Sequence, residues 1–376
     1  MRRPRSAGMA LTASLIAAVA LCAAGGTAVA VPPATPTAGP ERAASTSFNV
    51  PGILVSVTAA GPDNVWAVGC GGTCSSFPAY RTLIVHWNGR TWSQVTNPKP
   101  VGGVLYSVFA AGPDNVWAVG ATINAFAEFK TLIMHWNGKA WSRQPAGVPV
   151  LAGALTSVAA SGSRVWVAGE TGAPLVLQRT AGRWYVVPIS RPGDVYGGTI
   201  AAAGNAAWVA FDGGKNLDTA ALWRWTGSLW KPAAFPLRGP DNDIDWMAAG
   251  PAGDIWAVGY HDGATHSPLS MLWNGKTWRK VPVPAPPDSA LNGAGFVPGG
   301  TAWAVGWAGA TVAKTLILRW TGHAWARVNS PTPTGSASLF SVAATSSANA
   351  WAVGDGHANK PPYVTVILHW NGKTWS

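Results

Sequence analysis

Features that would point to a particular activity are scarce or missing in this sequence. Asp, Glu, Lys and Arg make up only 11% of the 376 residues. The basic residues are scattered, whereas a nucleic-acid-binding surface needs them clustered, so we expect no nucleic-acid partner. No stretch after the first thirty residues resembles a membrane span. No nucleophile elbow, zinc-protease His-Glu motif or phosphate-binding glycine loop occurs, which leaves no motif that indicates an enzyme.

The N-terminal segment has the pattern of a secretory signal. Three arginines lie within the first five residues, the apolar run 9–24 follows, and Ala28-Val29-Ala30 provides the small residues that a signal peptidase accepts. We therefore expect residues 1–30 to be removed and the protein to be secreted, as an extracellular or cell-surface protein. Residues 31–46 are rich in Pro, Ala and Thr and predict a flexible linker. Residues 47–376 form the predicted folded domain.

Charge and cysteine content fit an exported protein. Without the three signal arginines, 23 basic and 15 acidic residues remain, a net charge of +8. Such a balance favours anionic surfaces only weakly, and salt weakens that attraction further. Cys70 and Cys74 are the two cysteines beyond the signal and are separated by Gly-Gly-Thr. This spacing in an exported chain predicts a local disulfide, and two thiolates without nearby histidines do not complete a zinc site.

A tandem repeat dominates the rest of the sequence. A tryptophan in a Val-Trp-Ala-Val-Gly-like segment recurs at steps of 42 to 51 residues, and a second tryptophan follows a Trp-Asn-Gly-Lys-like turn in every copy. The first tryptophan occurs at Trp66, Trp117, Trp166, Trp208, Trp256, Trp303 and Trp351. The second occurs at Trp92, Trp141, Trp184, Trp230, Trp278, Trp325 and Trp375. Because order and spacing agree, the domain consists of seven copies of one unit.

Each copy predicts four short antiparallel strands. Runs of four to seven residues rich in Val, Ile, Leu, Trp and Thr alternate with turns such as Gly-Pro-Asp-Asn and Asn-Gly, which suit tight reversals. Units of this kind without helical periodicity are typical of propeller blades. We therefore predict an all-β, seven-bladed β-propeller of four-stranded antiparallel blades.

The last copy ends soon after its second tryptophan, at Ser376. The segment 47–51 has the extended, apolar character of the missing part. We hypothesise that it completes the outer strand of the last blade and so removes an exposed sheet edge. The alternative is that the chain is truncated.

The repeated phrases resemble a known group. Asn115-Val116-Trp117-Ala118-Val119-Gly120 and His135-Trp136-Asn137-Gly138-Lys139 are similar to the tryptophan-rich (WAVG / HWNGKTW) repeats of β-propeller proteins exported by actinobacteria. The resemblance covers nearly the whole mature chain and implies a fold but little chemistry. A looser similarity is to Asp-box or BNR-type propellers, including sialidases. Gly89-Arg90-Thr91-Trp92 matches the end of the Asp-box turn, while Trp87 stands where its aspartate would be.

Most aromatic and histidine residues occupy repeat positions. Twenty of the 23 tryptophans fall at three such positions, and we interpret them as blade packing. His86, His135 and His369 share a position that holds Arg or Leu in other copies, which favours a structural role over metal binding. Trp307 follows Gly306 in what we read as a variable loop, where it is either an exposed ligand platform or a loop anchor.

The loops between second and third strands vary most in length and content, as a binding surface on a rigid scaffold would. Acids, aromatics and the histidines His261, His266 and His357 gather there. Aromatic faces beside carboxylates suit sugar hydroxyls or basic peptide groups. The ligand-binding candidates are Glu128, Asp212, Tyr260, His261, Asp262, Trp307, Asp355 and Tyr363.

Asp241, Asp243 and Asp245 alternate in the predicted linker before the fifth blade. Their spacing permits a calcium ion, although the glycine and the distant glutamate of an EF-hand loop are missing. The alternative is a solvated acidic linker. We expect no other cofactor.

These observations favour a secreted, non-catalytic binding or adhesion propeller that recognises carbohydrate or protein through its loop-rich face. The alternatives are a secreted polysaccharide hydrolase or lyase on the same scaffold, and a structural or assembly protein of the cell envelope, because fold does not decide function. We expect a monomer.

Overall fold

The computed structural model describes residues 48–74, 80–100, 102–144, 152–189, 195–213, 220–235, 237, 241–250, 252–357 and 362–376. The predicted signal and linker lie outside these residues. The described chain is almost entirely β, with one short 3-10 turn at Pro333–Gly335. This confirms the predicted fold class.

Seven antiparallel sheets follow one another along the chain, and each is one blade. Blades 1 and 2 consist of β1 (Gly52–Gly61), β2 (Asn64–Gly71), β3 (Arg81–Trp87) and β4 (Trp92–Gln94), and of β5 (Gly103–Gly112), β6 (Asn115–Ile123), β7 (Phe129–Trp136) and β8 (Trp141–Arg143), respectively. Blades 3 and 4 consist of β9 (Ala154–Ser161), β10 (Arg164–Glu170), β11 (Pro174–Thr180) and β12 (Arg183–Val186), and of β13 (Val195–Ala203), β14 (Ala206–Gly213), β15 (Ala221–Trp225) and β16 (Trp230–Ala233), respectively. Blades 5 to 7 contain β17 (Asn242–Ala249), β18 (Ile255–Asp262), β19 (His266–Trp273), β20 (Trp278–Lys280); β21 (Ser289–Val297), β22 (Thr301–Ala308), β23 (Lys314–Trp320), β24 (Trp325–Val328); β25 (Ala337–Ser346), β26 (Asn349–Gly356) and β27 (Val364–Trp370).

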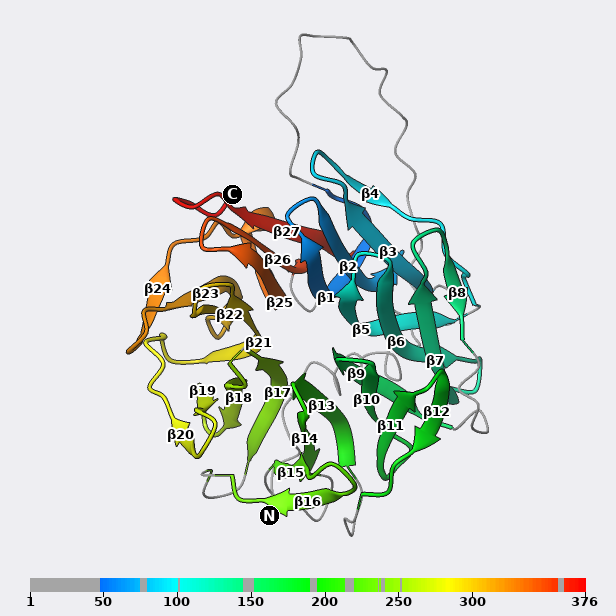
Figure 1. The fold of residues 1–376 in the computed structure, drawn as a ribbon. Coiled ribbons are helices and arrows are strands. Elements are labelled where there is room, and N and C mark those ends of the chain that lie inside the picture. Colours follow the sequence, from blue (N-terminus) through cyan, green and yellow to red (C-terminus); the bar gives the residue numbers. More distant parts are fainter. Residues whose placement is uncertain are drawn as a thin grey trace, which may run out of the picture.

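The seven blades form a closed ring (Figure 1). The first strand of each blade lies nearest the centre and contacts the first strands of both neighbouring blades, and β25 of the last blade contacts β1 of the first. The fourth strands lie at the periphery. Antiparallel pairing therefore places all hairpin turns between first and second strands, and between third and fourth strands, on one side. We call that side the turn face, and the opposite side the loop face.

Tryptophans pack the blades against one another. Trp66 of blade 1 lies against Trp136 and Trp141 of blade 2, with ring centroids 4.9 and 5.4 Å apart. The same arrangement repeats around the ring, and Trp351 of blade 7 closes it against Trp87 and Trp92 of blade 1. The seven first tryptophans are at most 2% exposed. This confirms that the repeated tryptophans are packing residues, as the repeat predicts.

The position before the third-strand tryptophan also has a structural role. Nε2 of His86 lies 2.9 Å from Oδ1 of Asn64, and its ring lies against Trp66. His135 and His369 make the same two contacts in their own blades. Where an arginine replaces the histidine, as at Arg179, its guanidinium lies over a tryptophan ring instead. The structural reading of these histidines is therefore confirmed.

Hydroxyl groups join neighbouring first strands near the ring centre. Ser56 in β1 accepts a hydrogen bond from the backbone N–H of Val108 in β5 at 3.1 Å. Ser107, Ser157, Thr199 and Ser341 make the equivalent bond to the next blade. Strands β1 and β2 also approach closely at the glycine of the Val-Trp-Ala-Val-Gly segment, because a Cβ on Gly69 would collide with the backbone carbonyl of Ile53.

The segment before β1 pairs with the last blade, as predicted. Val50 accepts a hydrogen bond from the backbone N–H of Thr365 at 3.0 Å, and Pro51 bridges to Val364. Phe48 and Val50 pack on the apolar cluster between blades 7 and 1. At the other end of β27, Trp375 bridges to Trp370. Residues from both ends of the domain therefore share the outer edge of the three-stranded blade 7.

Candidate functional site

One position at the loop-face end of each second strand carries most of the chemistry. It directly follows the four-residue Trp-x-x-Gly segment and its equivalents. Its occupants, from blade 1 to blade 7, are Cys70, Ala121, Glu170, Asp212, Tyr260, Trp307 and Asp355. Four of the predicted candidates thus share one structural position, although the sequence analysis treated them as separate loop residues.

The assignment of these candidates to loops is wrong. Asp212 lies in β14, Tyr260 in β18, Trp307 in β22 and Asp355 in β26, where each pairs with the first strand of its blade. His261 and Asp262 end β18. The second strands are longer than the four-residue segment suggests, because the first strand continues beside them to the loop face. Asp212, Tyr260 and Asp355 are consequently buried, and Trp307 is partly buried.

Two candidates lie outside the strands. Glu128 is exposed in the loop before β7, where its carboxylate accepts a hydrogen bond from Nδ2 of Asn124 at 2.8 Å. The backbone N–H groups of Phe126 and Glu128 donate to Oδ1 of the same asparagine, which orders this loop. Phe126 at its tip is 85% exposed. Tyr363 directly precedes β27 and packs on an apolar cluster.

Two acids at the shared position connect neighbouring blades. Oε2 of Glu170 accepts a hydrogen bond from the backbone N–H of Gly197 in the next blade at 3.0 Å. Oδ1 of Asp212 accepts from the backbone N–H of Ile244, also at 3.0 Å. Burial raises the pKa of Glu170, while the bond from Gly197 opposes that shift. Glu170 and Asp212 therefore have a structural role in positioning the first strands of blades 4 and 5.

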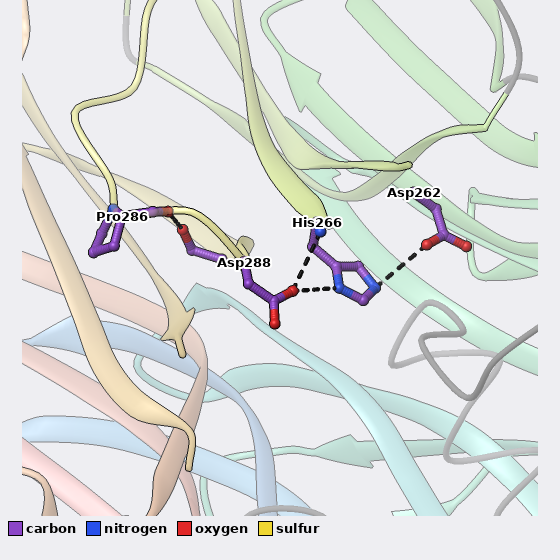
Figure 2. A network of polar contacts seen from close by, with 5 residues as sticks. Asp262, His266, Pro286 and Asp288 are labelled. Carbon is purple, nitrogen blue, oxygen red and sulfur yellow. Dashed lines mark hydrogen bonds and ion pairs between the residues drawn. The ribbon is translucent and has the colours of Figure 1, made fainter. Parts of the chain in front are cut away.

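A histidine between two aspartates lies where blades 5 and 6 meet on the loop face (Figure 2). Nδ1 of His266 is 2.9 Å from Oδ1 of Asp288, which also accepts the backbone N–H of His266. On its other side, Nε2 is 3.5 Å from Oδ1 of Asp262. The rings of Tyr260 and Trp307 meet the imidazole edge-on, with centroids 5.2 and 5.4 Å away. We call these five residues the histidine cluster.

Sequence reasoning singled out four members of this cluster but missed Asp288. Asp288 precedes the first strand of blade 6 with a positive φ of 56°, and Asp241 precedes that of blade 5 with a φ of 63°. Gly102 fills the equivalent position before β5 in the same left-handed region. Aspartate tolerates that region better than most residues do, so an aspartate directly before a first strand was the available signal.

Four carboxylates act on the phenol of Tyr260. Burial raises the pKa of Tyr260 above its ordinary value, and the negative charges of nearby carboxylates add to the shift. These carboxylates belong to Asp245, Asp243, Asp212 and Asp262. Asp243 pairs directly with Tyr260 across β17 and β18. We call these four aspartates the acidic group.

The three aspartates considered for calcium are not a linker. Asp243 and Asp245 lie within β17, while Asp241 precedes it and uses its backbone carbonyl to accept the N–H of Asp262 at 2.8 Å. In the part of the chain that the structure describes, no group of three or more His, Cys, Asp or Glu side chains is placed to hold a metal ion.

Both ring nitrogens of His266 in the histidine cluster face carboxylates. Nδ1 of His266 is occupied by Asp288. Nε2 is buried and makes no hydrogen bond within the described residues, and Asp262 lies beside it. The cluster therefore joins the loop-face ends of blades 5 and 6.

The opposite part of the loop face is apolar. Residues from blades 7, 1, 2 and 3 form one buried cluster there, including Val55, Tyr106, Ala154 and Phe340. Cys70 and Cys74 belong to this cluster and are joined by a disulfide that fixes the loop after β2. Beneath the loop face, blades 7, 1, 2 and 3 thus enclose an apolar cluster, while the acidic group lies in blades 4 and 5.

Comparisons with known proteins support the fold. No protein-family model and no curated protein matches the chain. The solved structure of YCF48 bound to D1 peptide is similar, with a TM-score of 0.50, 21% identity, and coverage of 74% of this chain and 81% of that chain. YCF48 from Cyanidioschyzon merolae also has a TM-score of 0.50, with 17% identity and coverage of 74% and 86%. At these identities the likeness concerns the propeller fold alone. The resemblance to actinobacterial repeat proteins is not confirmed by these matches.

Across the described ranges, the structure contains no helix with the length and apolar character needed to cross a membrane.

Proposed function

We propose that this protein is a secreted, non-catalytic binding propeller that takes a protein ligand on its loop face over blades 5 and 6. The observation that carries the proposal is the histidine cluster. Its partly buried Trp307, His266 and Asp262 bring aromatic surface and hydrogen-bonding groups together at the ends of strands that are otherwise apolar. Aromatic anchors beside charged groups are the usual composition of protein-binding sites.

Other observations support a protein ligand and export. YCF48, a propeller of similar fold, was solved bound to a peptide. The ordered loop that presents Phe126 lies on the same face and offers an exposed hydrophobic anchor. The signal-like residues 1–30, the Cys70–Cys74 disulfide and the resemblance to exported actinobacterial repeat proteins support secretion.

Carbohydrate is the second candidate ligand. Trp307 and Asp262 both contact His266, so a partly buried indole and a carboxylate lie on either side of one imidazole. This combination favours a sugar, because sugars combine an apolar face with hydroxyl donors. A carbohydrate ligand would occupy the same face, so both candidates can be tested on the same protein.

The test is a parallel screen of the purified protein on an array of 15-residue peptides of varied sequence and on a glycan array. The double variant Asp262→Asn, Trp307→Leu removes one negative charge and one aromatic ring from the histidine cluster. Asp63→Asn with Leu229→Ala changes exposed residues of the turn face and is the matched control.

We expect peptide binding that the loop-face variant loses and the control keeps. Binding to glycans alone, with the same pattern, would replace the protein ligand by carbohydrate. Binding that only the turn-face control loses, or release of sugar products from a glycan, would overturn the proposal.

A further inference from the structure

The end of the third strand and the fourth strand of every blade form an outer hairpin that is basic. Each outer hairpin runs from the third-strand tryptophan, or from Arg179 in blade 3, to the end of the fourth strand or of the chain. None of these hairpins contains an aspartate or glutamate, and each contains at least one exposed lysine or arginine. The exposed basic residues, from blade 1 to blade 7, are Arg90, Lys139, Arg143, Arg183, Lys231, Lys276, Arg279, Lys280, Arg327 and Lys373. Basic residues that are scattered along the sequence therefore share the outside of the ring.

Carboxylates do not balance these charges directly. Within the described ranges, both ion pairs involve His266, so no lysine or arginine there forms one. In blade 1 an aspartate lies beside the outer turn, since a Cβ on Gly89 would collide with Asp63, and blade 2 repeats this arrangement. The equivalent glycines of blades 4 to 6 have open space at the same position; they are Gly227, Gly275 and Gly322. The outside of the ring is therefore most uniformly positive over blades 4 to 6.

The exposed basic residues of these three blades are Lys231, Lys276, Arg279, Lys280 and Arg327. We call these five residues the basic rim. They belong to β16, β20 and β24 and to the turn before β20. These three strands follow one another along the periphery of the propeller (Figure 1). The basic rim is therefore one surface that extends over neighbouring blades.

Two arginines carry positive charge across the interfaces between these blades. The guanidinium of Arg224 in blade 4 lies over Trp273 of blade 5, 5.6 Å from the ring centroid. The guanidinium of Arg279 in blade 5 lies over Trp320 of blade 6, 5.7 Å from the ring centroid. Both arginines are exposed. The aromatic rings hold these guanidinium groups in place but do not neutralise their charge.

We propose that the basic rim binds a linear acidic polysaccharide, a chain whose sugars carry carboxylates at regular intervals. This inference goes beyond the ligand of the loop face and does not depend on it. Several cations on one surface create a positive potential that attracts an extended anion. Lysine and arginine also donate charge-assisted hydrogen bonds to carboxylates. The signal-like residues 1–30 favour an extracellular location, where the rim would meet such chains.

The shape and chemistry of the rim favour this chain over two other anionic partners. The rim is convex because it is the outside of a ring, so a stiff DNA duplex would have to bend to follow it. Single-stranded nucleic acids stack their bases on aromatic side chains, whereas Trp230 and Trp325 of these hairpins are buried. Lys276 lies in a turn on the turn face, while Lys280 lies further along the peripheral strand β20. A flexible chain can contact both positions, whereas a flat membrane contacts only one side of the molecule.

The test measures binding of the purified protein to polygalacturonate by biolayer interferometry at about 0.15 M NaCl. Polygalacturonate is linear and carries one carboxylate per sugar, and its fully methyl-esterified form is the uncharged control. The rim variant is Lys276→Gln, Arg279→Gln, Lys280→Gln. The matched variant removes one arginine and two lysines from exposed positions outside the outer hairpins; it is Arg81→Gln, Lys99→Gln, Lys130→Gln.

A second rim variant, Lys231→Gln with Arg327→Gln, changes blades 4 and 6 and leaves the contact between Arg279 and Trp320 intact. It tests the rim independently of any loss of stability at that contact. The melting temperature of each variant shows whether it is folded.

We expect polygalacturonate to bind and its esterified form not to bind. The rim variant should bind at least about tenfold more weakly and the second rim variant about threefold more weakly, while the matched variant keeps nearly the affinity of the wild type. No binding, equal binding of the esterified chain, or equal losses in the rim and matched variants would overturn the inference. A DNA duplex or phosphatidylglycerol vesicles that bind through the rim more tightly than polygalacturonate would also overturn it. Peptide binding at the loop face should survive in the rim variant, so this inference can fail while the proposed function stands.

Discussion

At the scale of single residues, the backbone decides several roles that side-chain chemistry alone misassigns. Asp241 was considered a calcium ligand, yet its place before β17 is a left-handed backbone position that Gly102 fills in blade 2. The sequence predicts Trp307 in a loop, yet Trp307 lies in β22 and packs edge-on against His266. Asp245 is the contrasting case, because neither backbone geometry nor hydrogen bonding accounts for it.

Asp245→Asn is predicted to stabilise the ligand-free protein at about pH 8 by roughly 1 to 3 kcal/mol, because it removes a buried carboxylate without a partner. The sign follows from the pKa, which is raised in the fold. Stability from such a group is present below its ordinary pKa of 3.8 and is lost as pH rises through the folded value. Urea unfolding at about pH 8 and about pH 5 measures the gain, which should shrink at the lower pH. A less stable variant at pH 8 would show that the carboxylate has a favourable partner.

Trp303→Ala is predicted to reduce the free energy of unfolding by about 3 to 5 kcal/mol, because this indole is fully buried between Trp370 and Trp375 of the next blade. Trp307→Ala, four residues later, should cost only about 1 to 2 kcal/mol, since the ring is partly exposed. Urea denaturation of the two variants gives both values. Equal losses would contradict the distinction between packing and surface tryptophans.

At the scale of elements, the repeat in the sequence was sufficient to predict the blades. Hairpin turns and the spacing of Trp66 and Trp92 determine where strands reverse, and every blade reuses the same contacts between tryptophans. The pairing of Val50 and Pro51 with the last blade agrees with a prediction made from the extended, apolar character of this segment. The extension of second strands to the loop face was not predictable, since it depends on pairing with first-strand residues 17 to 19 positions earlier in the chain, as between Asp243 and Tyr260 and between Asn242 and His261.

The chain without residues 1–51 is predicted to be less stable than the chain without residues 1–46 by about 2 to 4 kcal/mol. Hydrogen bonds between Val50 and Thr365 are worth about 1 kcal/mol each, and the buried surfaces of Phe48 and Val50 add to them. Differential scanning calorimetry of the two proteins measures the difference. The same melting temperature for both would mean that this pairing does not hold the ring closed.

The histidines beside the third-strand tryptophans predict a loss of stability in mild acid. Burial lowers the pKa of His86, His135 and His369 below 6.5, so the unfolded chain binds protons more readily than the fold. Stability is therefore full above about pH 6.5 and falls as pH decreases below it. Melting temperatures between about pH 7.5 and pH 5.5 test this, and the triple variant His86→Gln, His135→Gln, His369→Gln is the control. The raised pKa values of Glu170 and Asp245 make stability rise as pH falls, which opposes the effect of the histidines. The test therefore compares the change in melting temperature with pH between the wild type and the triple variant.

At the scale of the whole molecule, the packing of neighbouring blades decides which side chains meet on the loop face. Asp262 and Asp288 are 26 residues apart and belong to different blades, and only the packing of blade 5 on blade 6 places both beside His266. The buried apolar cluster of blades 7, 1, 2 and 3 and the acidic group of blades 4 and 5 likewise form only when neighbouring blades pack together. A single repeat contains neither.

The most direct test of the binding face is hydrogen–deuterium exchange of the protein with and without the tightest peptide from the array. The account predicts slower exchange in the segments 258–268 and 286–308, which contain the histidine cluster, and unchanged exchange in the hairpin turns of the turn face. Protection restricted to the turn face, or spread evenly over all seven blades, would contradict the assignment of the ligand to the loop face of blades 5 and 6.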